Sequence, residues 1–101
     1  MVIYKETPTL KILIAHITAK VKSYWRYQGA EDDWECTVYV QQDRVGNVEA
    51  VNIQNCNTGD SDKARSFKNS IERAVYKASP LPSSFYEGVF NLEIQFEFRV
   101  N

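Results

Sequence analysis

The sequence has little glycine, proline, cysteine and histidine, and it lacks a long apolar run. Its 101 residues include four glycines, three prolines, two cysteines and one histidine. So few glycines and prolines are typical of an ordinary globular protein rather than a low-complexity chain. No apolar run approaches the roughly 20 residues that a membrane-spanning helix needs. Two cysteines and a single remote histidine make an incomplete ligand set for zinc. We therefore expect no membrane span, no metal and no cofactor.

An excess of charge of one sign is also lacking. Twelve Lys and Arg stand against thirteen Asp and Glu, which gives a net charge of −1 at pH 7. Such a balance provides no overall basic field to attract nucleic acid or anionic lipid. The sequence has no glycine-rich phosphate loop, and no spacing of serine or cysteine with a base indicates nucleophilic catalysis. We predict that the chain is not an enzyme, and a nucleic-acid-binding module is the alternative from another class.

Periodicity predicts a helix and a hairpin in the first half of the chain. Residues 1–8 are expected to form a loose segment, followed by a helix with Thr9 as its N-cap. From Glu35 the pattern alternates as in a strand, and a turn over 43–46 leads to a second strand over 47–56 with a bulge near Ala50. The apolar positions of the helix are Leu10, Leu13, Ile14, Ile17 and Val21.

The second half predicts another helix and the most regular strand. A Ser or Asp cap before Lys63 begins a helix that ends near Ala78, because Ser79 precedes a proline. One helical turn is expected over 83–89. The buried stripe of the helix is Ala64, Phe67, Ile71, Ala74, Val75 and Ala78. The final strand places Leu92, Ile94, Phe96, Phe98 and Val100 on one face and Glu93, Gln95, Glu97 and Arg99 on the other.

The order α-β-β-α-β predicts an α+β fold in a single domain over residues 1–101. We expect a three-stranded antiparallel sheet packed on one face by helices. Three short strands cannot close into a barrel, so two edges remain open. The backbone N–H and C=O groups of an edge strand can pair with an extended segment of another protein. The final strand is the candidate, although its pattern does not distinguish an edge strand from a central one.

The two cysteines lie on opposite arms of the predicted hairpin. If the turn centres near Gly46, residues whose numbers sum to about 92 face one another, and Cys36 and Cys56 meet that condition. The alternative is two separate buried thiols, and the spacing alone leaves both interpretations open.

Other polar and aromatic residues favour ordinary structural roles. The stretch Tyr24–Tyr27, with Trp34 nearby, could stack on bases or sugars, but without gathered basic residues we favour packing against the sheet. His16 is expected to be a solvated or half-buried histidine without a chemical role. The acidic pairs Asp32 and Asp33, and Asp60 and Asp62, are interpreted as solvated loop acids or a helix cap.

The stretch Ser66–Pro82, with its corner Ala78-Ser-Pro-Leu-Pro82, resembles the C-terminal domain of TolA from the Tol–Pal cell-envelope system. The resemblance extends from Leu10 to Val100 and includes Cys36-Thr-Val-Tyr-Val40, Cys56-Asn-Thr-Gly-Asp60 and Phe96-Glu-Phe98. The chain departs from that family in a longer link over 60–65, in the absence of Asp-Pro within 83–88, and in its final Asn101.

The resemblance implies a non-enzymatic, periplasmic binding domain whose inner-membrane anchor is not part of this chain. The implied partners are TolB and related envelope proteins, and filamentous phage attachment proteins and colicins use the same domain. A TonB-type domain that binds outer-membrane transporters is the alternative. The resemblance also favours a Cys36–Cys56 disulfide, because the periplasm is oxidising. By strand addition, the implied partner-binding residues are Leu92, Glu93, Ile94, Gln95, Phe96, Glu97, Phe98 and Arg99.

Overall fold

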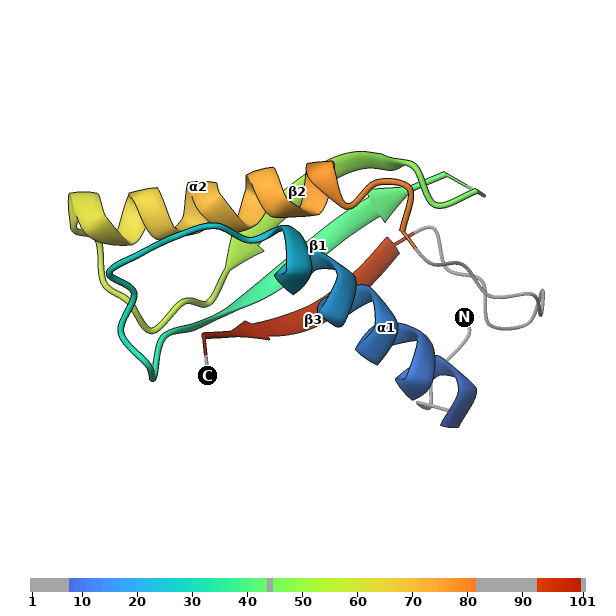
Figure 1. Ribbon diagram of the computed structural model, residues 1–101, viewed down its shortest axis with the longest axis horizontal. Coiled ribbons are helices and arrows are strands. Elements are labelled where there is room, and N and C mark those ends of the chain that lie inside the picture. Colours follow the sequence, from blue (N-terminus) through green and yellow to red (C-terminus); the bar gives the residue numbers. More distant parts are fainter. Residues whose placement is uncertain (1–7, 44, 82–92, 101) are drawn as a thin grey trace.

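The computed structural model describes residues 8–43, 45–81 and 93–100, which form two helices and three strands (Figure 1). The elements are α1 (Pro8–Tyr24), β1 (Glu35–Gln42), β2 (Val48–Gln54), α2 (Asp62–Lys77) and β3 (Glu93–Arg99). The predicted α+β fold and the element order α-β-β-α-β are therefore confirmed. The helical turn expected over 83–89 lies outside the described residues, as does Leu92.

The sheet has the order β2-β1-β3, so that the first strand of the sequence is the central one. β1 pairs antiparallel with both neighbours, and Val38 lies opposite Ile53 of β2 and Phe96 of β3. Both helices contact strands of the sheet. Figure 1 shows α1 crossing near β3 and α2 running along the β2 side. Both helices cover the same face of the sheet, and the other face is called the open face below.

One hydrophobic cluster joins the helices to the covered face of the sheet. Alternate residues of the strands enter it because successive side chains of a strand point to opposite faces. Phe67 of α2 and Phe98 of β3 are the largest fully buried side chains, and burial of each stabilises the fold by about 2–3 kcal/mol. The strands contribute Cys36, Val38, Val40, Ile94, Phe96 and Phe98, and α1 contributes Ile17 and Val21.

The helix α2 follows its predicted pattern closely. Ser61 is the N-cap, and its hydroxyl oxygen accepts the N–H of Ala64 at 3.1 Å. All six residues of the predicted stripe are buried. Ser70 is buried as well, because its hydroxyl accepts the indole N–H of Trp25 at 2.8 Å and donates to the carbonyl of Phe67 at 2.6 Å. Hydrophobic periodicity alone could not identify this polar contact.

Two predicted details of the N-terminal half need correction or refinement. The helix α1 begins at Pro8, so Thr9 lies inside it and is not the N-cap. Proline is favoured in the first helical position, where its missing N–H would have no intrahelical partner. The bulge expected near Ala50 is present one residue away: Gln41 pairs with Ala50 and Gln42 with Val48, which leaves Glu49 as the extra residue.

Candidate functional site

The strand β3 forms one edge of the sheet among the described residues. It pairs with β1 in unbroken register over seven residues, from Glu93 opposite Gln41 to Arg99 opposite Glu35. The sequence pattern could not tell whether the final strand is an edge strand or a central one, and among the described residues it is an edge strand. Seven of the eight residues predicted to bind a partner belong to this strand, and Leu92 lies outside the described residues.

The unpaired backbone groups of β3 can be identified from its register. Antiparallel residues alternate between pairs that exchange backbone hydrogen bonds and pairs that do not. The N–H of Val100 donates to the carbonyl of Trp34 at 3.1 Å, just beyond the ends of the two strands. The same alternation directs the backbone groups of Ile94, Phe96 and Phe98 toward β1. It turns the N–H and C=O groups of four residues outward: Glu93, Gln95, Glu97 and Arg99.

The side chains of β3 divide in the same way. Ile94, Phe96 and Phe98 are buried in the core, so their side chains anchor the strand and are not accessible to another molecule. The four residues with outward backbone groups expose their side chains on the open face. Two of them have partners on β1: Arg99 forms an ion pair with Glu35 at 3.0 Å, and Glu97 accepts the hydroxyl hydrogen of Thr37 at 2.8 Å.

The opposite edge, formed by β2, presents fewer backbone groups. By the same alternation, Val51 and Ile53 direct their N–H and C=O groups away from β1. The bulge at Glu49 interrupts the regular pairing, and a bulge is one way in which proteins blunt a sheet edge. At the hairpin end, Ser79 accepts the N–H of Val48 at 3.0 Å.

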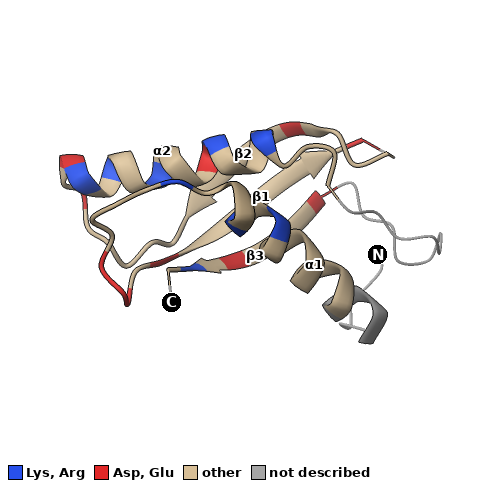
Figure 2. Ribbon diagram, in the orientation of Figure 1, with Lys and Arg blue, Asp and Glu red and all other residues tan. Residues whose placement is uncertain are grey.

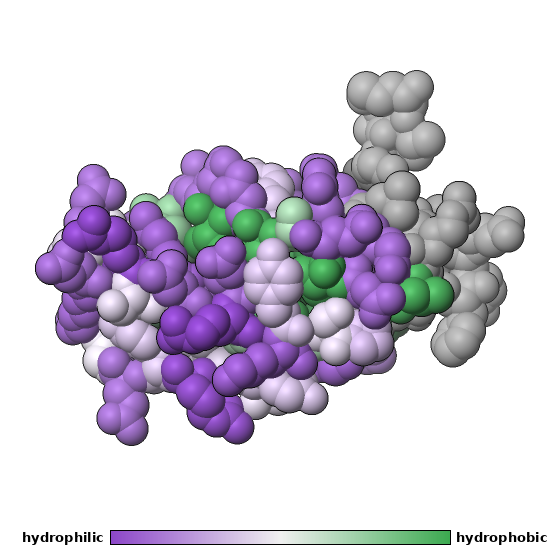
Figure 3. All heavy atoms as spheres, turned by 90° about the horizontal axis from the view of Figure 1, so that it is seen from above, coloured by the Kyte–Doolittle hydropathy of each residue, from purple (hydrophilic) through white to green (hydrophobic). Residues whose placement is uncertain are grey.

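Side-chain packing also distinguishes the β2 edge from the β3 edge. The helix α2 contacts β2, and Val48, Val51 and Ile53 are partly buried against the core. Figure 3 views the molecule from above, on the side where α2 lies, and shows apolar residues gathered in a strip among hydrophilic ones. The larger apolar side chains of β2 are therefore partly covered, while Glu49, Asn52 and Gln54 are exposed; in β3 every exposed side chain is polar.

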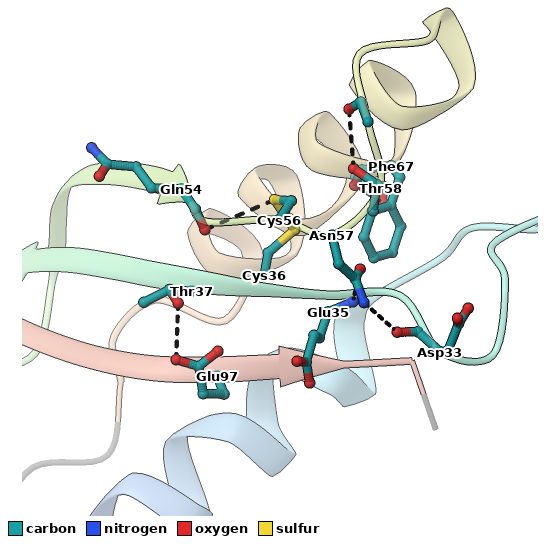
Figure 4. The surroundings of a disulfide bond; sticks show 12 residues. Asp33, Glu35, Cys36, Thr37, Gln54, Cys56, Asn57, Thr58, Phe67 and Glu97 are labelled. Atoms are coloured by element: carbon teal, nitrogen blue, oxygen red, sulfur yellow. Dashed lines mark hydrogen bonds between the residues drawn. A yellow bond between two sulfur atoms is a disulfide. The ribbon is translucent and has the colours of Figure 1, made fainter.

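The predicted Cys36–Cys56 disulfide is present in the structure (Figure 4). The sequence pattern predicted that residues whose numbers sum to about 92 face one another. In the hairpin the sum is one lower, since Thr37 lies opposite Gln54. Asn55 then adopts a positive φ of 56°, a conformation that asparagine tolerates better than most residues, and Cys56 reaches Cys36. Within the described residues no cysteine is free.

The segment after the disulfide is held to β1 by one asparagine side chain. Asn57 accepts the N–H of Glu35 at 2.9 Å through Oδ1 and donates to the carbonyl of Asp33 at 2.7 Å through Nδ2. The N–H of Asn57 also donates to the carbonyl of Glu35 at 3.2 Å. The end of β2 is thus fixed by one covalent bond and three hydrogen bonds.

Of the aromatic residues that were expected from the sequence to pack into the protein, Trp25, Tyr27 and Trp34 do so, whereas Tyr24 at the end of α1 is exposed. Trp25 makes edge-on contacts with Phe67 and Phe98, with ring centroids 6.0 and 5.1 Å apart, and Trp34 lies 5.0 Å from Phe67. Tyr27 contacts Phe67 at 5.8 Å. Because these rings surround one core phenylalanine, we assign them to stability rather than to stacking on a ligand. His16 is exposed, as predicted.

The open face contains a depression that the sequence analysis did not identify. Its volume is about 530 Å³, and it lies over β1 and β2 with Glu93 of β3 at its border. The lining residues are Tyr39, Gln41, Ala50, Val51, Asn52, Gln54 and Glu93. The only sequence signal was the polar half of the β1 alternation. The described residues contain no group of three or more His, Cys, Asp or Glu suited to a metal ion.

Comparison with protein-family models finds no match for this chain, and comparison with curated proteins finds none either. Over the residues described by the structure, neither helix is both long and apolar enough to cross a membrane. The disulfide is consistent with an oxidising compartment.

Proposed function

We propose that this chain is a non-enzymatic, periplasmic protein-interaction domain of the TolA type, and that it binds an extended partner segment along β3. The observation that carries the proposal is the position of β3 at the sheet edge, in unbroken register and with alternate backbone groups turned outward. A partner strand would gain main-chain hydrogen bonds from the four alternate residues of β3 whose backbone groups point outward. The resemblance of Ser66–Pro82 to the TolA domain names the expected partner, which is a TolB-like envelope protein.

The packing of β3 supports this role. Three of its side chains are buried in the core, so the edge is held rigid before a partner arrives. Preorganisation lowers the entropy cost of binding. Glu93, Glu97 and the Arg99–Glu35 ion pair border the strand and would select a partner by charge. The Cys36–Cys56 disulfide also supports the periplasmic location, because disulfides persist in oxidising compartments.

A proline at Gln95 tests the proposal. The Gln95 N–H points away from β1, so the substitution Gln95→Pro removes an outward donor without removing a bond of the sheet. We expect affinity for a TolB N-terminal peptide to fall at least about 100-fold, because the proline ring also obstructs the incoming strand. Titration calorimetry with the oxidised protein measures the loss, and circular dichroism should remain native-like.

Two control variants make the test specific. Gln95→Ala keeps the N–H and should bind the peptide normally. Val51→Pro makes the equivalent change on the outer side of β2 and should also leave binding intact. Binding that survives Gln95→Pro but is lost in Val51→Pro would assign the partner to the β2 edge. A titration with a transporter box peptide in place of the TolB peptide separates the TolA type from the TonB type.

A further inference from the structure

The nearly neutral total charge conceals a strong separation of charge between the helices and the sheet. The two helices contain eight of the twelve Lys and Arg residues and two of the thirteen acidic residues. The three strands contain four acidic residues and a single arginine. Figure 2 shows mostly blue segments on the helix layer and red segments on the strands and loops. The helix layer is therefore a positive surface on a protein whose net charge is −1.

Most cations of this layer are available for an external partner. We use the name basic helix face for Lys22 of α1, Arg26 just beyond the end of α1, and four residues of α2: Arg65, Lys68, Arg73 and Lys77. Arg65 pairs with Asp62, but Lys22, Lys68, Arg73 and Lys77 form no ion pair with any described residue. An exposed cation with no protein partner keeps its full charge for a ligand. Among the described residues only part of the helix charge is therefore neutralised, by the pairs Arg65–Asp62 and Lys63–Glu31.

The spacing of these cations fits a broad surface better than a narrow site. α2 has 16 residues and is therefore about 24 Å long, and the members of the basic helix face on it extend from Arg65 to Lys77. Tyr24 and Tyr76 expose 43% and 45% of their surface on the same two helices. Tyrosine is enriched where protein meets the headgroup region of a bilayer, because its ring is apolar and its hydroxyl is polar.

We propose that the basic helix face docks on a bilayer that contains anionic phospholipid. The negative phosphates complement the positive helix layer, and each Lys or Arg near such a surface contributes about 1 kcal/mol. In this orientation the open face of the sheet turns away from the bilayer, because both helices cover the other face (Figure 1). The inference rests on charge distribution and goes beyond the proposed function at β3.

Vesicle co-sedimentation of the whole chain tests the proposal. We expect binding to vesicles of phosphatidylcholine mixed with phosphatidylglycerol, little binding to phosphatidylcholine alone, and a decrease in binding as salt is added. The triple variant Lys68→Gln, Arg73→Gln, Lys77→Gln should lower the partition coefficient roughly 100-fold. These residues lie on the exposed side of α2 or at its border, so circular dichroism of the variant should be unchanged.

A matched pair of single variants tests whether vesicle binding depends on the basic helix face or only on the net charge of the protein. Arg73→Gln and Arg99→Gln each remove one positive charge, but only Arg73 belongs to the basic helix face. We expect Arg73→Gln to weaken vesicle binding about fivefold and Arg99→Gln to leave it unchanged. Equal losses in both variants would overturn the proposal, as would the absence of binding to anionic vesicles at low salt.

Binding assays with two soluble polyanions test the alternative partners of the basic helix face. Poly-glutamate represents an acidic protein, and a single-stranded oligonucleotide represents nucleic acid. Binding of either with no binding of anionic vesicles would overturn the membrane proposal in favour of that class of partner. Because the triple variant leaves β3 intact, it should still bind the TolB peptide, so this proposal and the proposed function fail independently.

Discussion

β2 and β3 both flank β1, but the two edge strands differ in regularity and in the contacts that hold them. β2 carries a bulge at Glu49, contacts α2 and is followed two residues later by the Cys36–Cys56 disulfide. β3 keeps seven residues in regular register and has polar side chains beside its outward backbone groups. Regular edges are reactive because their main-chain groups can pair with another chain. β2 is therefore the more restrained edge and β3 the more regular one, which is the difference on which the proposed binding along β3 depends.

Removing the disulfide should have the largest effect on this comparison. We expect the double variant Cys36→Ala, Cys56→Ala to lose about 3 kcal/mol of unfolding free energy, because the bond closes a loop of about 20 residues. Hydrogen exchange should increase first at the amides of β2 and much less at those of β3. Chemical reduction of the natural protein is the control and should give the same order. Equal acceleration in both strands would contradict the view that the bond protects the β2 side.

A smaller effect is expected at the turn that leads into β2. Gly46 has a φ of +91°, and a Cβ there would clash with the backbone carbonyl oxygen of Leu81. The Leu81 N–H also donates to the Gly46 carbonyl at 2.7 Å. We expect Gly46→Ala to destabilise the protein by about 2 kcal/mol or more, because strain and the clash act together.

A second glycine provides the matched control for this prediction. Gly59 has a φ of +76°, and no atom lies within 4 Å of its added Cβ. Gly59→Ala therefore tests strain alone and should cost about 1 kcal/mol. Urea denaturation measures both variants. Similar losses in the two would show that the contact between the turn and Leu81 does not protect this end of β2.

The smallest effect concerns pH and the same turn. The side-chain amide of Asn47 donates to Asp43 at 2.9 Å and is the main cause that lowers the pKa of this carboxyl group. Desolvation opposes the shift, and the backbone N–H groups of Asn47, Val45 and Gly46 lower the pKa further. Because the pKa of Asp43 is lower in the folded state, its carboxylate stabilises the fold at pH values above the ordinary aspartate pKa of about 3.9. This contribution is lost as the pH falls through the lowered pKa of the folded state.

Acid titration of Asp43→Asn checks this prediction. The variant should lose the part of the acid-side decline in stability that comes from Asp43, while its stability near neutral pH falls slightly. Exchange of the β2 amides should respond to acid before exchange of the β3 amides does. An unchanged acid profile in the variant would show that the turn does not couple to pH.

Periodicity predicted the helices and strands because burial of one face imposes a period of 3.6 or 2 on the chain. The stripe of α2, the alternation of β3 and the bulge beside Ala50 are all visible in that way. The start of α1 was misplaced because proline can occupy the first turn as well as precede it. The contact between Ser70 and Trp25 joins residues 45 positions apart, and no local pattern signals it.

The sequence by itself determined which side of each helix and strand is buried, since each element sorts its apolar residues locally. The tertiary structure alone decided the strand order, because an edge strand and a central strand of a one-sided sheet can show the same alternation. It also decided where the charges gather: both helices cover one face, so cations that are dispersed along the chain share one layer. Chain order places residues in elements, but only packing places elements beside one another.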